Sequence, residues 1–136
     1  MTIPVLPGTH VKTSLPGRLT ARAAVGFARI LAKRKPKKIK RILTTLRAGA
    51  RPASFAEARA ARDTVLTVSP RCCGSRACLT RSIASVLLCR ARGRWPTWCV
   101  GVLAAPPFTA HAWIEAEGRM VDELLDGTCY RQMISV

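Results

Sequence analysis

The stretch "CLTRSIASVLLCRARGRWPTWCVGV", residues 78–102, changes from a helical to a strand pattern of apolar residues. Its second half, "WPTWCVGVL", predicts a strand over residues 95–103. Its first half predicts a helix over residues 78–92, which Gly93 ends and whose apolar stripe consists of Leu79, Ile83, Val86 and Leu87.

Three more helices are predicted upstream, and the first two are strongly basic. Ser54 and Glu57 form a capping box, so a helix begins there and continues until Pro70 stops it. "GRLTARAAVGFARILAK", residues 17–33, predicts a helix, and "PKKIKRILTTLRAG", residues 36–49, predicts another. The apolar residues at helical spacing in the first of these, which we expect to face the core, are Leu19, Ala23, Phe27, Ile30 and Leu31.

A β-hairpin is predicted downstream of the strand. "HAWIEAEGRMVDE", residues 111–123, alternates on both sides of the two-residue turn Glu117-Gly118. Helices therefore come first and a small antiparallel sheet follows, which is the order of an α+β fold.

The charge of the 136-residue chain is positive and unevenly distributed, with a formal net charge of +16. Residues 1–52 contain 13 Lys or Arg and no Asp or Glu. We therefore divide the chain into a basic helical region, 1–52, and a core, 53–136, with the basic region either part of the same compact unit or a docking arm. Its basic side chains form either an ordinary solvated face or a docking surface for an acidic partner. Nucleic acid is not favoured, because no recognition motif accompanies the charge.

The sequence predicts a cytoplasmic protein. No run approaches the roughly 18 apolar residues of a membrane span. The start, "MTIPVLPGTHVK", lacks the basic and apolar regions of a signal peptide. In a reducing cytosol the six cysteines would be thiols, of which one could be reactive.

Cys78 and His111 are the candidate catalytic residues. Cys78 lies in the first turn of a predicted helix, where the helix dipole and free N–H groups favour a thiolate. Arg76 and Arg81 add positive charge nearby. A nucleophilic cysteine also needs a histidine and a group that orients it, which His111 and the acidic residues of the hairpin could supply.

The other cysteines and a metal site are the alternatives. A single cysteine is more often a small buried residue than a nucleophile, and a single histidine is more often structural. Cys72 and Cys73 are the nearest rivals, but the predicted loop gives them no helix dipole. We interpret the remaining three as structural: Cys89, Cys99 and Cys129. No Cys-x-x-Cys pair is present, so we expect no zinc site and no other cofactor.

Two segments together resemble a known family: residues 78–102 and "PPFTAHAWIEAEGRMVDE", residues 106–123. A Cys-Leu-x-Arg-Ser helix, a strand ending in Gly-Val, an Ala-His-Ala-Trp-Ile-Glu strand and a Gly turn resemble the leader peptidases of lasso-peptide biosynthesis. The match covers about residues 54–126. The resemblance implies a papain- and transglutaminase-like cysteine protease fold, with Cys78 as nucleophile and His111 as base.

The resemblance also implies partners. The chain has no room for a fused leader-recognition domain, so it looks like the split form of the protease, which acts with a separate recognition protein. Its substrate would be the precursor peptide, and an ATP-dependent cyclase would use the product. No segment resembles an ATP-binding loop, so we assign no nucleotide to this chain.

We expect the residue that orients His111 to lie near the end of the hairpin. With a two-residue turn, the return strand carries Asp122 on the same face as His111. A bulge at Gly118 would shift the register by one residue and bring Glu123 there instead. The resemblance favours Asp122, because the orienting residue of the family is an aspartate, and Asp126 is a third candidate.

Two other functions remain open from the sequence. The chain could be a basic, non-enzymatic binding protein for nucleic acid or an acidic partner, whose function would not depend on Cys78. It could also be a transglutaminase-like acyltransferase, because the same three residues serve hydrolysis and acyl transfer.

Overall fold

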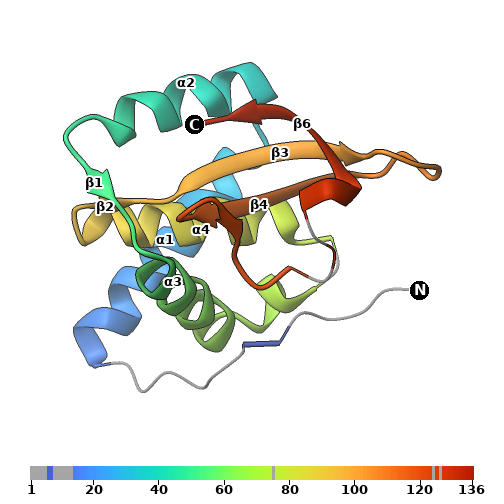
Figure 1. Ribbon diagram of the computed structural model, residues 1–136. Coiled ribbons are helices and arrows are strands. Elements are labelled where there is room, and N and C mark those ends of the chain that lie inside the picture. The colour runs from blue at the N-terminus through green and yellow to red at the C-terminus, as the bar shows by residue number, and fades with distance from the viewer. Residues whose placement is uncertain (1–5, 8–13, 75, 124, 126) are drawn as a thin grey trace.

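The computed structural model describes residues 6–7, 14–74, 76–123, 125 and 127–136 (Figure 1). Four helices come first in the chain and are followed by the main sheet. The helices are α1 (Leu15–Leu31), α2 (Pro36–Arg47), α3 (Phe55–Val68) and α4 (Cys78–Ala91), with short 3-10 turns η1 (Pro70–Cys73) and η2 (Gly127–Cys129). The strands are β1 (Arg51–Pro52), β2 (Arg94–Trp95), β3 (Thr97–Leu103), β4 (Ala110–Ala116), β5 (Arg119–Met120) and β6 (Tyr130–Ser135). The α+β prediction is confirmed.

The two helix-capping signals predicted from the sequence, at the start of α3 and the end of α4, are present in the structure. The Ser54 hydroxyl accepts a hydrogen bond from the Glu57 N–H, and the Glu57 carboxylate accepts one from the Ser54 N–H, so the capping box that begins α3 is complete. Gly93, at φ 76°, follows the end of α4 and takes the left-handed conformation typical of a residue after a helix.

The main sheet has the order β5-β4-β3-β6, and all its pairings are antiparallel. The turn between β4 and β5 is formed by Glu117 and Gly118, with φ of 55° and 75°, as expected for a two-residue hairpin turn. Ala116 pairs with Arg119, so the predicted turn is confirmed and there is no bulge at Gly118. The sequence did not predict β6, which pairs with β3 and completes the sheet.

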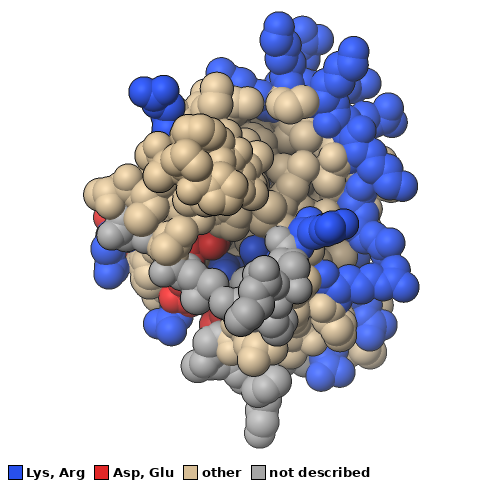
Figure 2. Space-filling view, turned by 90° about the vertical axis from the view of Figure 1, so that its right-hand side faces the viewer, with Lys and Arg blue, Asp and Glu red and all other residues tan. Residues whose placement is uncertain are grey.

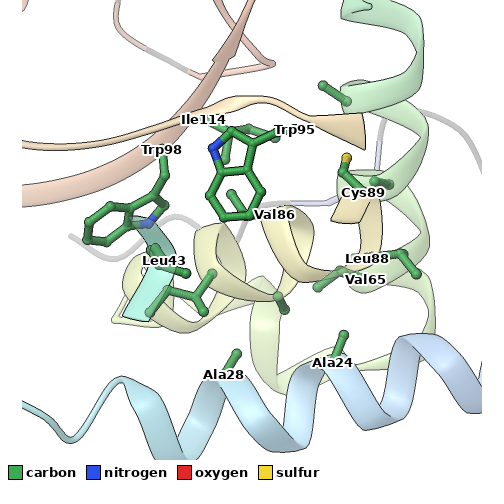
Figure 3. Packing of buried hydrophobic residues seen from close by; sticks show 14 of the residues in the cluster. Ala24, Ala28, Leu43, Val65, Val86, Leu88, Cys89, Trp95, Trp98 and Ile114 are labelled. Carbon is green, nitrogen blue, oxygen red and sulfur yellow. The ribbon is translucent and has the colours of Figure 1, made fainter. Parts of the chain in front are cut away.

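Helix α4 lies between the main sheet and helices α1 and α3. It packs against β4 on one side and against α1 and α3 on the other (Figure 1). Figure 3 shows Ala24 and Ala28 of α1 pointing into the same cluster that Leu43 of α2 and Trp98 of β3 enter. The Trp98 indole donates a hydrogen bond of 3.0 Å to the Ser82 hydroxyl, which fastens β3 to the first half of α4.

The prediction of which face of α1 is buried is wrong. The residues that face the core are small or branched and allow α1 to lie close to α4: Ala21, Ala24, Val25, Ala28 and Leu31. Of the five residues predicted to be buried, only Leu31 is. Phe27 and Ile30 are 47% and 60% exposed. Both faces of α1 are apolar at helical spacing, and a sequence pattern does not tell which one packs.

Among the described glycines, Gly101 of β3 leaves the least room for a side chain. A Cβ atom there would lie 2.4 Å from the Arg131 carbonyl oxygen and 2.9 Å from the Trp113 ring. We expect Gly101→Ala to lower the free energy of unfolding by about 1–3 kcal/mol, measured by urea denaturation. Gly26→Ala on α1, where nothing lies within 4 Å, is the matched control and should raise stability by about 0.5–1 kcal/mol. An equal effect of both substitutions would show that β6 does not pack on Gly101.

None of the helices in the described ranges is long and apolar enough to cross a membrane.

Candidate active site

Cys78 is the first residue of α4, as predicted. Ala77 precedes it and provides no side-chain cap, so the N–H groups of the first helical turn have no capping side chain. The thiol of Cys78 is partly buried. This placement gives the sulfur the positive end of the helix dipole and adjacent N–H groups.

His111 lies on β4, where it pairs with Gly101 of β3. Helix α4 packs against this strand, so the imidazole lies next to the start of α4. The thiolate of Cys78 accepts hydrogen bonds from the His111 ring and from the backbone N–H of Ala112. The Nε2 atom of His111 is 2.9 Å from the Glu123 carboxylate, which leaves Nδ1 for Cys78.

The contacts between these groups shift the pKa values of the thiol and the imidazole toward a charged pair. Burial alone would raise the pKa of Cys78, but the hydrogen bonds from His111 and Ala112 outweigh it and lower the pKa below its ordinary value. Burial alone would lower the pKa of His111, but hydrogen bonds to Cys78 and Glu123 and their charges raise it to about 9. Both shifts favour a thiolate and an imidazolium over a neutral thiol and imidazole.

The carboxylate that contacts His111 belongs to Glu123 and not to Asp122. The hairpin has the predicted register, but β5 ends at Met120, and Asp122 takes a positive φ of 48°. The chain therefore leaves the ladder before Asp122 can pair across from β4. Its carboxylate contacts Arg59 at 2.8 Å, while the Glu123 carboxylate reaches His111. Asp126, the third candidate, lies outside the described residues.

Two buried arginines underlie the site, and neither role was predicted from the sequence. Nη2 of Arg62, on α3, is 3.8 Å from the second oxygen of Glu123, and Arg62 is only 3% exposed. Arg81 donates hydrogen bonds to the carbonyls of Cys72 and Gly74, which ties the loop before Cys78 to α4. The sequence does hold a clue to the role of Arg62. This residue lies among the apolar residues of the buried face of α3, and a buried charge requires a partner.

Aromatic rings enclose the imidazole. The ring of Tyr130, on β6, stacks on His111 with 5.2 Å between centroids, and Trp113 lies 6.0 Å away. Tyr130 also contacts Trp113, so the three rings form one group. Because strand β6 was not predicted from the sequence, the position of Tyr130 beside His111 was not predicted either.

The comparisons with known proteins identify the family of this chain. A model of the transglutaminase-like superfamily matches residues 21–135. The chain belongs to the transglutaminase-like superfamily. Its members are usually enzymes, and they include cysteine proteases and acyltransferases. A search of curated proteins and a search of solved structures found no significant match.

Four of the other cysteines of this transglutaminase-like domain are less suited to nucleophilic chemistry. Cys72 is buried, and burial raises the pKa of Cys73. Burial also raises the pKa of both Cys89 and Cys99 to about 12. Of the cysteine pKa values that are shifted, only that of Cys78 is lowered.

Among the residues that the structure describes, no group of three or more His, Cys, Asp and Glu side chains is arranged to hold a metal ion. The site itself presents a thiol, an imidazole and a carboxylate.

The thiolate–imidazolium pair predicts the pH dependence of alkylation. The rate at which iodoacetamide modifies Cys78 should rise with pH at a midpoint below that of an ordinary thiol, because only the thiolate reacts. His111→Gln removes the hydrogen bond and charge that lower the pKa while burial remains, so the midpoint should move to higher pH. Rates are measured by mass spectrometry of the Cys78 peptide. The same midpoint in both proteins would contradict the pairing.

Proposed function

We propose that this chain is a cysteine peptidase that removes the leader peptide from a lasso-peptide precursor. One observation carries the proposal: the continuous chain of contacts from the Cys78 thiol through His111 to Glu123. We assign Cys78 as the nucleophile, His111 as the general base and acid, and Glu123, in place of the expected Asp122, as the residue that orients the imidazole.

The proposed reaction has two halves. The Cys78 thiolate attacks the carbonyl carbon at the leader–core junction, and the backbone N–H of Cys78 at the start of α4 donates to the resulting oxyanion. The His111 imidazolium protonates the amine of the core peptide, which leaves as the C–N bond breaks and a thioester forms. A water molecule, deprotonated by His111, then attacks the thioester and releases the leader carboxylate and the thiol.

Two features support a peptide substrate. The motifs around Cys78 and His111 resemble those of lasso-peptide leader peptidases, within a domain of the transglutaminase-like superfamily. An open pocket of about 540 Å³, lined in part by Glu115 and Arg119, adjoins the site at Glu123 and could hold part of a peptide.

The proposal includes three partners and a location. The partners are the precursor peptide, a separate leader-recognition protein, and the ATP-dependent cyclase that would use the released amine of the core peptide. We place the reaction in the cytoplasm, where the reduced Cys78 thiol that it requires would persist.

The test is incubation of this chain with the precursor, with and without the recognition protein, read by mass spectrometry. We expect two fragments, leader and core, whose masses sum to the precursor plus one water, and faster cleavage when the recognition protein is present. Because the superfamily also includes acyltransferases, a primary amine is added in a parallel reaction. Quantitative transfer of the leader to the amine without hydrolysis would replace the peptidase assignment with acyl transfer, and an intact precursor in every reaction would refute both.

A further inference from the structure

Helix α1 carries a second apolar face that the fold leaves uncovered. At 100° per residue the core-facing residues occupy one side of the helix, and a row of larger residues occupies the other. Leu15 is 71% exposed, Leu19 58%, and Phe27 and Ile30 are exposed to a similar degree. We call this row the α1 stripe, and it consists of Leu15, Leu19, Ala23, Phe27 and Ile30.

The size of these residues makes the α1 stripe unusual. Single apolar residues on a surface are ordinary, but several large ones in a continuous helical row mark an interaction site. Three of the five core-facing residues of α1 are alanines, while four large apolar residues of the same helix face solvent, which is the reverse of what stability alone favours. The α1 stripe therefore has the composition of a surface that is covered by another molecule.

The charges beside the α1 stripe indicate what kind of molecule would cover it. Arg18, Arg22 and Arg29 lie along one edge of the stripe, and residues 1–52 contain no acidic side chain. Lys and Arg gather along one side of the molecule (Figure 2). We infer that the α1 stripe docks an acidic, amphipathic segment of a partner protein, whose apolar face covers Leu19, Phe27 and Ile30 and whose carboxylates meet the arginine edge.

Two other occupants fit less well. A second copy of this chain would bring another arginine edge and no acidic residue from its own α1, so like charges would meet. A membrane-surface helix carries Lys and Arg around its polar face, whereas α1 carries arginines on one edge and no lysine within Leu15–Leu31. Arginine is enriched and lysine depleted at protein interfaces, and its planar guanidinium matches a carboxylate.

The test uses three labelled helical peptides and measures binding to the full chain by fluorescence anisotropy. The first has Leu and Phe at helical spacing beside a row of Glu, the second has the same composition in scrambled order, and the third has Lys in place of Glu. Only the first should bind the native chain. Two double variants, Phe27→Ser with Ile30→Ser and Arg22→Glu with Arg29→Glu, should each weaken its binding by roughly tenfold or more.

Matched controls separate a docking site from general attraction. Met133→Ser removes an apolar residue that is 67% exposed on β6, and Lys37→Glu with Lys38→Glu makes the same charge change on α2. Both should leave binding within about twofold. Circular dichroism and the alkylation rate of Cys78 should be unchanged in every variant, so a failure of this inference is distinguishable from a failure of the peptidase proposal.

Four outcomes would overturn the inference. The first peptide could bind all variants equally, or bind none including the native chain. Vesicles of phosphatidylglycerol and phosphatidylcholine could bind through the α1 stripe when the peptide does not, which would assign the surface to a membrane. Sedimentation could show a dimer that Phe27→Ser with Ile30→Ser dissociates, which would assign it to a second copy.

Discussion

Replacing Cys78 with alanine is expected to lower the rate of precursor cleavage by about 10⁴-fold or more, because the substitution removes the sulfur that forms the thioester. The side chain is partly buried and contributes little to the core, so the free energy of unfolding should change by less than about 1 kcal/mol. Cleavage is followed by mass spectrometry, and folding by urea denaturation.

Cys73→Ala is the matched control for this prediction. Cys73 is the partly buried thiol closest to Cys78 along the chain, and burial raises its pKa, so the variant should cleave at nearly the native rate. If Cys78→Ala cleaved at the native rate while Cys73→Ala did not, the nucleophile would have to be reassigned to the loop before α4.

Replacing Glu123 with glutamine is expected to reduce the cleavage rate by about 10³–10⁴-fold, with little change in KM. The carboxylate accepts a hydrogen bond from Nε2–H of His111 and so keeps Nδ1 directed at Cys78. Glutamine has nearly the same size but can present an N–H to the ring, which favours the wrong tautomer. It also removes a negative charge that raises the pKa of His111, so the imidazolium should be lost at lower pH than in the native chain.

Asp122→Asn provides the decisive comparison because it makes the same chemical change one residue earlier. Asp122 is bound to Arg59, whose side chain is 48% exposed, and it does not contact His111 through any bond that the structure records. We expect its activity to stay within about tenfold of the native rate. A large loss with Asp122→Asn and a small loss with Glu123→Gln would restore the interpretation made from the sequence.

The elements that bring Cys78 and His111 together were predictable from local sequence signals. The capping box at Ser54, the helix that begins at Cys78 and the two-residue turn at Glu117-Gly118 all depend on residues close together in the chain. The predicted strand over residues 95–103 is also present, as β3 and the adjoining β2. Local signals of this kind account for most of the fold.

The parts that could not be predicted depend on contacts between distant segments. The face of α1 that packs is chosen by the surface of α4, and both faces have helical spacing. Strand β6 exists because β3 offers it an edge, although its own residues are mostly exposed. The correct carboxylate follows from the positive φ at Asp122, a change of direction that alternation along a hairpin does not reveal.

Covalent catalysis by Cys78 is the central claim, and it is tested most directly by partitioning the thioester between water and hydroxylamine. Precursor is cleaved at increasing hydroxylamine concentration, and the released leader is analysed by mass spectrometry. A thioester on Cys78 predicts that the leader hydroxamate forms at the expense of the leader carboxylate, and that Cys78→Ala yields neither product. A leader released only as the carboxylate at every hydroxylamine concentration, with Cys78→Ala still active, would contradict the account.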